Sequence, residues 1–143
     1  MTDKADQTYR VERQIGHLLR RAHQRASAIF QETLEDPNLT PTQFAALMRL
    51  CDDGSMSQNH LGRLTAMDPA TIQGVMRRLE ERGLVQRAPD PKDRRRTILS
   101  PTEEGRRLAE RLVPSARAVT ARTLSPLSPE EQKTLIDLLD RLA

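Results

Sequence analysis

The stretch from Ser57 to Ser100, SQNHLGRLTAMDPATIQGVMRRLEERGLVQRAPDPKDRRRTILS, decides the fold. Its first half has the apolar spacing of two short helices, the first starting at Ser57 and the second capped by Asp68 and the proline after it. Its second half holds two brief strand-like runs, 84–87 and 96–99, joined by a charged turn. Two helices that meet at a tight turn and lead into a β-hairpin predict a winged helix-turn-helix, which binds DNA through its second helix.

The second helix of this stretch is expected to have one buried and one exposed face. Its apolar positions, spaced i, i+3, i+4 and i+7, are Ile72, Val75, Met76 and Leu79. The opposite arc of the helical wheel is centred on Ala70, Gly74 and Arg77 and is flanked by Thr71, Gln73 and Arg78. Small residues followed by Gln and Arg suit a helix that enters the major groove, since glutamine can pair with adenine and arginine with guanine.

Gly74 stands in the middle of this helix. A glycine there costs about 1 kcal/mol relative to alanine. Its presence indicates a close approach to the helix backbone, either by duplex DNA or by another helix, and we favour DNA.

Positive charge is concentrated in the same stretch. Residues 57–100 hold nine Lys and Arg against five Asp and Glu, whereas the rest of the 143 residues holds 14 against 15. This asymmetry is expected of a surface that meets phosphates, although charge alone would favour a solvated face. In the hairpin turn, Asp93 is surrounded by Lys92, Arg94, Arg95 and Arg96, and we expect it to orient a neighbouring arginine. An arginine at such a tip can enter the narrow minor groove of A·T-rich DNA.

Further helices are predicted on both sides of this stretch. Apolar residues at helical spacing predict one long amphipathic helix over 9–34. Three sequences of the form hydroxyl, proline, any residue, Gln or Glu predict capping boxes whose N-caps are Thr40, Ser100 and Ser128.

Other local signals place the ends and faces of these helices. The helix from Thr40 should stop at Gly54, and Leu61 and Leu64 should face inward from the short helix that follows. Pro114 should kink the long helix from Ser100, and Pro126 should end it.

The first and last helices carry apolar faces that lie outside the middle of the chain. The final helix offers a narrow stripe of leucines at 135, 138, 139 and 142, which is too small to form a core by itself. We therefore predict that 9–34 and 101–143 form the interface of a homodimer. The alternative is that these faces fold back on their own chain.

Composition limits the class of protein. A chain of 143 residues, 36% hydrophobic and 30% charged with no Trp, predicts one mainly α domain over 1–143 with an aliphatic core. The single cysteine, Cys51, excludes an internal disulfide or a four-cysteine zinc site and fits a reducing compartment. The polar start, MTDKADQTYR, has no apolar stretch behind it, so we expect a soluble, cytoplasmic protein with no membrane partner.

No pattern of catalytic residues stands out. The sequence has no Ser/His/Asp or Cys/His constellation and no glycine-rich phosphate loop, and His17, His23 and His60 are scattered. We therefore expect no enzyme activity, no cofactor and no resident metal. A metal-responsive regulator and a DNA binder without sequence preference remain open as alternatives.

The chain resembles the MarR family of transcriptional regulators over nearly its whole length. The resemblance rests on Ser57-Gln58, Leu61, Asp68, Thr71, Leu79-Glu80, Gly83-Leu84-Val85, Arg87, Asp90-Pro91, Asp93-Arg94-Arg95 and the Thr-x-x-Gly of 102–105. It implies a mainly α fold with a two-stranded β wing, a DNA-binding lobe over 40–100 and intertwined dimerisation helices over 9–34 and 101–143. Such dimers are expected to bind double-stranded DNA at a pseudo-palindromic operator.

Carried over by position, the resemblance also implies roles for single residues. Ser57 and Gln58 would touch backbone phosphates, residues from Pro69 to Gln73 would approach the bases, and Arg94 or Arg95 would reach the minor groove. The chain departs from the family pattern at Gly74, where many members have a larger residue, and at Pro101, where many have leucine.

The resemblance further implies a small anionic or phenolic effector that releases DNA. The first helix is basic, and on its wheel His23 and Arg25 flank the apolar stripe. With Phe44, Met48 and Met67 they would form an apolar pocket with a cationic rim, suited to an aromatic acid or its thioester. The alternative reading of each residue is structural, as a solvated helix edge or as core.

Cys51 offers a second regulatory hypothesis. A reactive cysteine would make the protein a redox-responsive regulator. Because Cys51 follows Leu47 and Met48, we favour its interpretation as a small buried hydrophobe.

Overall fold

The computed structural model describes residues 8–143, so residues 1–7 of the polar N-terminal stretch lie outside it. Its elements, in chain order, are a short 3-10 helix η2 (Val11–Arg13), α1 (Ile15–Thr33), α2 (Pro41–Asp53), α3 (Gln58–Leu64), α4 (Pro69–Glu81), β1 (Val85–Pro89), β2 (Thr97–Pro101), α5 (Glu103–Leu124) and α6 (Pro129–Leu142). The two strands pair antiparallel, with Val85 opposite Pro101 and Pro89 opposite Thr97. The predicted mainly α fold with a two-stranded wing is confirmed.

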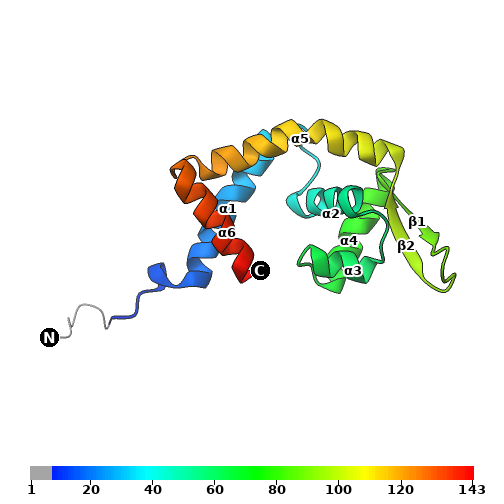
Figure 1. Ribbon diagram of the computed structural model, residues 1–143, viewed down its shortest axis with the longest axis horizontal. Coiled ribbons are helices and arrows are strands. Elements are labelled where there is room, and N and C mark those ends of the chain that lie inside the picture. Colours follow the sequence, from blue (N-terminus) through cyan, green and yellow to red (C-terminus); the bar gives the residue numbers. More distant parts are fainter. Residues whose placement is uncertain (1–7) are drawn as a thin grey trace.

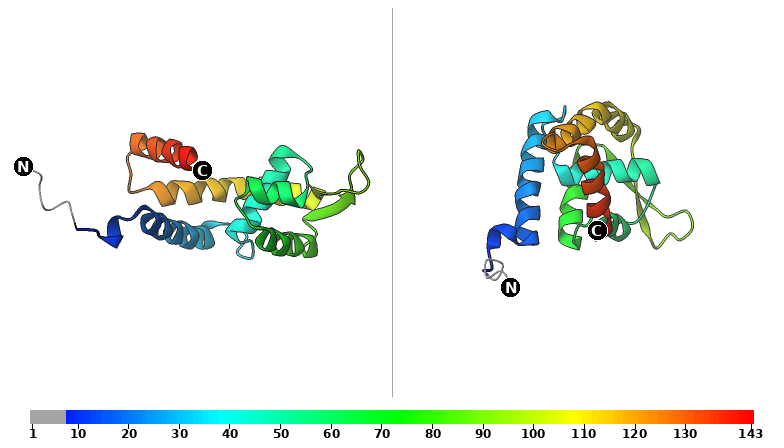
Figure 2. Two further views of the ribbon diagram at one scale, coloured as in Figure 1. Left: turned by 90° about the horizontal axis from the view of Figure 1, so that it is seen from below. Right: turned by 60° about the vertical axis from the view of Figure 1, so that its left-hand side comes forward.

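The elements form an arch (Figure 1). One leg, which we call the lobe, consists of α2, α3, α4 and the β1–β2 hairpin, or wing. The other leg consists of α1 and α6, and α5 spans the top between the two. In the left view of Figure 2, α1 and α6 lie on either side of the second half of α5, and the wing projects at the far end of the molecule.

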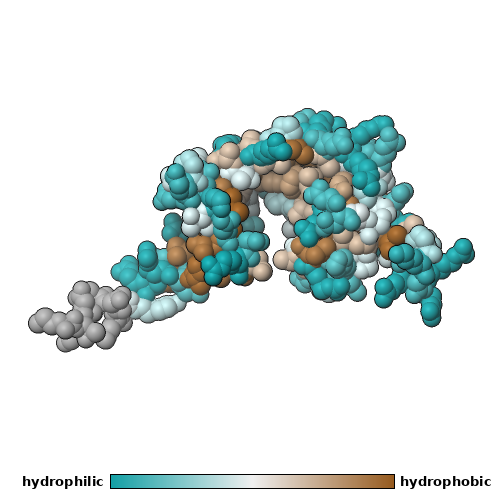
Figure 3. All heavy atoms as spheres, viewed as in Figure 1, coloured by the Kyte–Doolittle hydropathy of each residue, from teal (hydrophilic) through white to brown (hydrophobic). Residues whose placement is uncertain are grey.

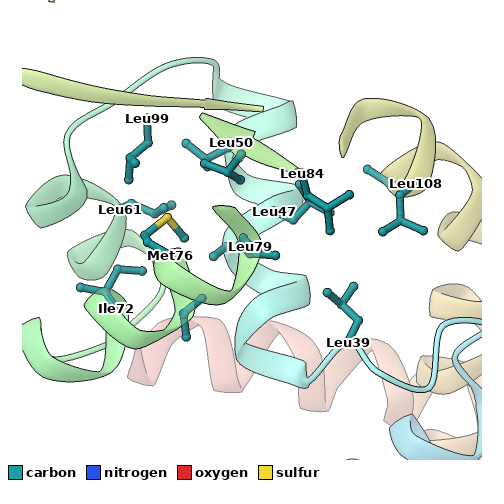
Figure 4. Close-up of a cluster of buried hydrophobic side chains, with 14 of the residues drawn as sticks. Leu39, Leu47, Leu50, Leu61, Ile72, Met76, Leu79, Leu84, Leu99 and Leu108 are labelled. Atoms are coloured by element: carbon teal, nitrogen blue, oxygen red, sulfur yellow. The ribbon is translucent and has the colours of Figure 1, made fainter. Parts of the chain in front are cut away.

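A core of aliphatic side chains holds the lobe together (Figure 4). The largest fully buried side chains are Leu47, Leu50, Leu61, Ile72, Met76, Leu79, Leu99 and Leu112. The predicted inner face of α4 is confirmed, since its four apolar residues are all buried. An edge-to-face contact between Phe30 and Phe44, with ring centroids 5.5 Å apart, joins α1 to this core.

Two of the three predicted capping boxes are confirmed. At α2 the backbone N–H of Gln43 donates to Thr40 Oγ1 at 3.3 Å, and the Gln43 side chain accepts from the Thr40 N–H at 3.3 Å. Ser128 and Glu131 make the same reciprocal pair at α6. The third prediction is wrong, because Ser100 lies in β2 opposite Gln86 and does not cap a helix. Pairing with β1 keeps the chain extended as far as Pro101.

The true N-cap of α5 is Thr102, which also ties the helix to the wing. Its hydroxyl accepts the backbone N–H of Gly105 at 3.0 Å and donates to the carbonyl oxygen of Gly83 at 2.6 Å. Gly105 packs so closely on the residue before β1 that an added Cβ would stand 2.1 Å from the carbonyl oxygen of Leu84. The Thr-x-x-Gly spacing is therefore what lets α5 leave the wing at this short distance.

Two other predictions also need correction. The helix expected over 9–34 is broken at Gln14, whose backbone is extended and whose side chain accepts the N–H of His17 at 2.6 Å to cap α1. Leu64 does not face inward but is 37% exposed, because α3 has only two turns and buries Leu61 and Gly62 instead. Gly54 ends α2 with a positive φ, as expected. Pro114 lies within α5, which continues to Leu124.

The packing of Gly105 predicts the cost of one added methyl group. Gly105→Ala should lower the free energy of unfolding by about 1–3 kcal/mol, since a rigid backbone carbonyl blocks the new Cβ. Gly74→Ala is the matched control, because a Cβ there would meet no atom within 4 Å and should stabilise α4 by up to about 1 kcal/mol. Urea unfolding followed by circular dichroism measures both. Equal midpoints for Gly105→Ala and the wild type would contradict the packing described here.

Candidate nucleic-acid interface

The outer face of α4 is open to solvent, with Gly74 and Glu80 half-buried and the other residues of the face exposed. Asp68 caps the helix by accepting the Thr71 N–H at 2.8 Å, and this hydrogen bond lowers the pKa of its carboxyl group. A hollow of about 450 Å³ follows this face and is lined by Ala70, Gln73, Gly74, Arg77, Glu80 and Arg87. Burial of the apolar face of α4 thus leaves the predicted base-reading side of the helix open to solvent.

A second hollow lies between α3 and the wing. It measures about 490 Å³ and is lined by Ser57, Gln58, Asn59, Arg63, Arg87, Arg96 and Thr97. Ser57 caps α3 by accepting the His60 N–H at 3.2 Å. Three arginines, from α3, from β1 and from the turn just before β2, therefore line a polar depression beside the cap of α3, an arrangement suited to phosphate.

Arg87 lies at the junction of these two hollows and lines both. Its Nη2 donates to Gln58 Oε1 at 2.7 Å, and its Nε donates to the Glu80 carboxylate. One β1 side chain thus links the first turn of α3 with the last turns of α4. The two hollows form one continuous surface across α3, α4 and the base of the wing.

Local hydrogen bonds shape the turn at the end of the wing. The carboxylate of Asp90 accepts the Lys92 N–H at 2.9 Å, and that of Asp93 accepts the Arg95 N–H at 3.1 Å. Asp93 also accepts from Arg95 Nε at 3.4 Å, so the prediction that Asp93 orients a neighbouring arginine is confirmed. Lys92, Arg94 and Arg95 are all exposed at the tip, where Figure 3 shows a strongly hydrophilic surface.

The sequence did not single out Asn59 and Arg63 as part of this surface. It placed Arg96 among the basic residues of the hairpin tip and Arg87 among the residues that carry the family resemblance, with no role in binding for Arg87. Asn59 and Arg63 are four residues apart on α3, so their common face could have been found from helical spacing. The role of Arg87 could not, because its partners Gln58 and Glu80 are 29 and 7 residues away in the chain.

The C-terminal end of α4 is anchored to the connection between α1 and α2. Arg82 donates to Asp36 Oδ2 at 2.6 Å. Burial acts to raise the pKa of Asp36, but the hydrogen bonds from Arg82 and from the Asn38 N–H outweigh it and the pKa is lowered. This ion pair connects the end of α4 with the chain that leads to the other leg of the arch.

The effector pocket predicted from His23, Arg25, Phe44, Met48 and Met67 is not assembled within residues 8–143. Arg25 donates to the carbonyl oxygens of Arg122 and Thr123, at 3.1 and 3.3 Å, and so caps the end of α5. Met48 lines a hollow of about 210 Å³ against α5, apart from the hollow of about 570 Å³ that Arg25 lines between α1 and α5.

The remaining three residues of that prediction have other partners. The Phe44 ring packs on Phe30, and Met67 packs against the core of the lobe. A ring nitrogen of His23 lies 3.5 Å from Ser27 Oγ, within α1. The structural interpretation therefore fits Phe44 and Met67, which belong to the core.

Cys51 lies half-buried on α2 and faces α5. Burial raises the pKa of its thiol, and the nearby Arg106 only partly opposes this shift. The protonated thiol is a poor nucleophile, which does not favour redox sensing.

Residues 8–143 hold no cluster of three or more His, Cys, Asp and Glu side chains with the arrangement of a metal site. Among the same residues, no helix combines the length and the hydropathy of a membrane span.

Comparison with known proteins agrees with this geometry. The MarR family profile matches residues 39–97. The HTH-type transcriptional repressor NicR of Pseudomonas putida is 44% identical over 134 residues, which cover 94% of this chain and 85% of NicR.

Solved structures share the whole architecture. A probable transcriptional regulator from Pseudomonas aeruginosa superposes with a TM-score of 0.89 at 50% identity, covering 94% of this chain and 100% of that one. BpsR of Bordetella bronchiseptica, whose DNA binding is regulated by 6-hydroxynicotinic acid, superposes with a TM-score of 0.88 at 42% identity, covering 94% and 96%. The structure has a winged helix-turn-helix with a basic surface, and its relatives match it along nearly the full chain. This protein therefore belongs to the MarR family of transcriptional regulators.

Proposed function

We propose that the protein is a homodimeric repressor that binds a pseudo-palindromic operator and is released from it by a small aromatic acid. The observation that carries this proposal is the continuous surface in which the two hollows meet at Arg87. The surface joins an open recognition helix, a basic depression beside α3 and an exposed basic wing tip. Repression is supported by the similarity to NicR.

The proposal assigns each part of this surface to one part of the duplex. The outer face of α4 lies in the major groove and offers Pro69, Ala70, Thr71, Gln73, Gly74, Arg77 and Arg78. Ser57 and Gln58 meet the phosphate backbone, beside Arg63 and Arg96. Lys92, Arg94 and Arg95 carry the wing into the neighbouring minor groove.

A second copy of the chain is the partner of the terminal helices. Apart from Leu64, the large exposed hydrophobic residues of the described chain are Tyr9, Val11, Ile15, Leu18, Leu19, Ile136, Leu138, Leu139 and Leu142. All nine lie at or within the first and last helices, and Figure 3 shows hydrophobic surface on that leg. Although α6 is amphipathic, it buries no residue in the single chain. A symmetric dimer would cover these faces and place two copies of α4 on one palindromic site.

The effector belongs to the class of small aromatic acids, with their thioesters as the second group to test. Support comes from BpsR, whose DNA binding responds to 6-hydroxynicotinic acid. We place the effector where the dimerisation helices meet the lobe, so that its binding changes the spacing of the two recognition helices.

Substitutions on the DNA-facing surface should separate affinity from specificity. Arg94→Ala and Arg95→Ala should each weaken binding to all duplexes. Each should also reduce the slope of log affinity against log salt concentration by about one, the contribution of one phosphate contact. Gln73→Ala should instead relax preference at particular base pairs, by about 1–3 kcal/mol. Fluorescence anisotropy on a duplex selected from a random pool measures both. Arg107→Ala is the control, because Arg107 is exposed on α5 and pairs with Glu103.

Two results would contradict the assignment to DNA. Unchanged binding in Arg94→Ala, Arg95→Ala and Gln73→Ala would exclude the proposed placement of helix and wing. A steep salt dependence without any preference for a sequence would identify a general DNA binder instead.

Dimerisation should depend on the apolar face of α6. Ile136→Glu and Leu139→Glu bury a charge if a second copy covers this face, so the variants should sediment as monomers. Lys133→Ala, on the Lys133–Asp137 ion pair of the same helix, should sediment like the wild type. A wild-type chain that sediments as a monomer at micromolar concentration would exclude the homodimer.

The effector class can be tested by linkage between binding and stability. At 100 times its dissociation constant, a ligand that binds only the native state adds about 2.7 kcal/mol of apparent stability. We expect 6-hydroxynicotinic acid or another aromatic acid in a thermal-shift panel to raise the Tm and to release operator DNA in the same concentration range. If no aromatic acid or thioester does both, this part of the proposal fails.

A further inference from the structure

Neither packing nor backbone conformation in the described part of the chain requires a glycine at position 74. A Cβ added to it would meet no atom within 4 Å, whereas one added to Gly62 would approach the Met67 carbonyl to 3.1 Å. Its backbone is helical, since the glycines with positive φ in the described chain are Gly54 and Gly83. The entropic cost of a mid-helix glycine is therefore not offset by packing or by turn geometry. The sequence left two explanations for Gly74, a close approach by DNA or by another helix. No second helix of the described chain occupies the space beside Gly74.

The surface around Gly74 has a distinct chemistry. Ala70 and Gly74 are four residues apart and form one row on α4, which offers a single methyl group and bare backbone. Gln73 and Arg77 form the next row and border the hollow with polar groups. The Glu80 carboxylate in the same hollow is paired with Arg87, which reduces its repulsion of DNA. The result is a small apolar notch with hydrogen-bond donors beside it.

We propose that this notch seats the 5-methyl group of one thymine in each operator half-site. The inference rests on the proposed function, because it assumes that α4 enters the major groove. Thymine is the base that presents a methyl group there, and small apolar side chains are its usual contacts. A Cβ at position 74 would occupy the space into which that methyl group projects. Gly74 is therefore a specificity-determining residue that selects a T·A pair through a missing side chain.

The test removes one methyl group from the DNA and adds one to the protein. A duplex selected from a random pool by the wild-type chain is remade with deoxyuridine in place of each thymine in turn. For the wild type, one position in each half-site should weaken binding about fourfold, the effect expected for one lost apolar carbon. Other positions should change little.

The Gly74→Ala variant should show the reverse preference. It should bind the thymine duplex about tenfold more weakly than the wild type, because two methyl groups compete for one space. Deoxyuridine at the sensitive position should restore most of that loss. The raised Tm expected for this variant shows that its fold is intact.

The outcomes separate this inference from the proposed function. If no deoxyuridine weakens binding by the wild type, or if Gly74→Ala keeps the preference for thymine, the notch does not seat a methyl group although the protein still reads DNA. If the wild type selects no sequence from the pool, the proposed function fails and this inference fails with it. Reversal of the preference at one position per half-site supports both.

Discussion

Burial of the apolar face of α4 is the constraint on which the rest of the structure depends. Ile72, Met76 and Leu79 are almost completely inaccessible to solvent, and side chains of α2, α3 and β2 surround them (Figure 4). A helix with a single apolar stripe can bury that stripe against the core in only one orientation. Once that stripe is buried, Gln73 and Arg77 must face outward. The core of the lobe and the orientation of its DNA-facing surface therefore have the same physical cause.

Polar contacts then fix those distances between elements that packing of the core does not fix. Arg87 joins β1 to α3 and α4, and Thr102 joins the start of α5 to the turn before β1. Each of these bonds lies near the surface and contributes modestly to stability. Their importance is geometric, since they hold the wing and α4 at a defined separation. The proposed binding to two grooves of one duplex requires that separation to be constant.

The two legs of the arch differ in how completely their apolar side chains are buried. The lobe has its own core, whereas α6 buries nothing and the first helices expose Ile15, Leu18 and Leu19. Physical links between the legs run through α5, through the contact of Phe30 with Phe44 and through the Asp36–Arg82 ion pair at the end of α4. A change in the packing of the terminal helices would reach the recognition helix by these routes. This arrangement provides a physical route for the effector control proposed above.

The sequence by itself determined those features that depend on neighbours within about four residues. The caps at Thr40, Asp68 and Ser128 and the inner face of α4 are of this kind, because helical periodicity and N-cap hydrogen bonds are local. The basic wing tip, with Asp93 beside Arg95, was predictable for the same reason.

Only the tertiary structure decided features that join distant parts of the chain. Strand pairing moved the start of α5 from Ser100 to Thr102, and Arg87 found partners on two helices. Arg25, expected to line an effector pocket, caps α5 almost a hundred residues later in the chain. A sequence pattern records which residues can make such contacts. Which partner each one meets depends on how the buried faces pack, and that is settled only when the whole chain is folded.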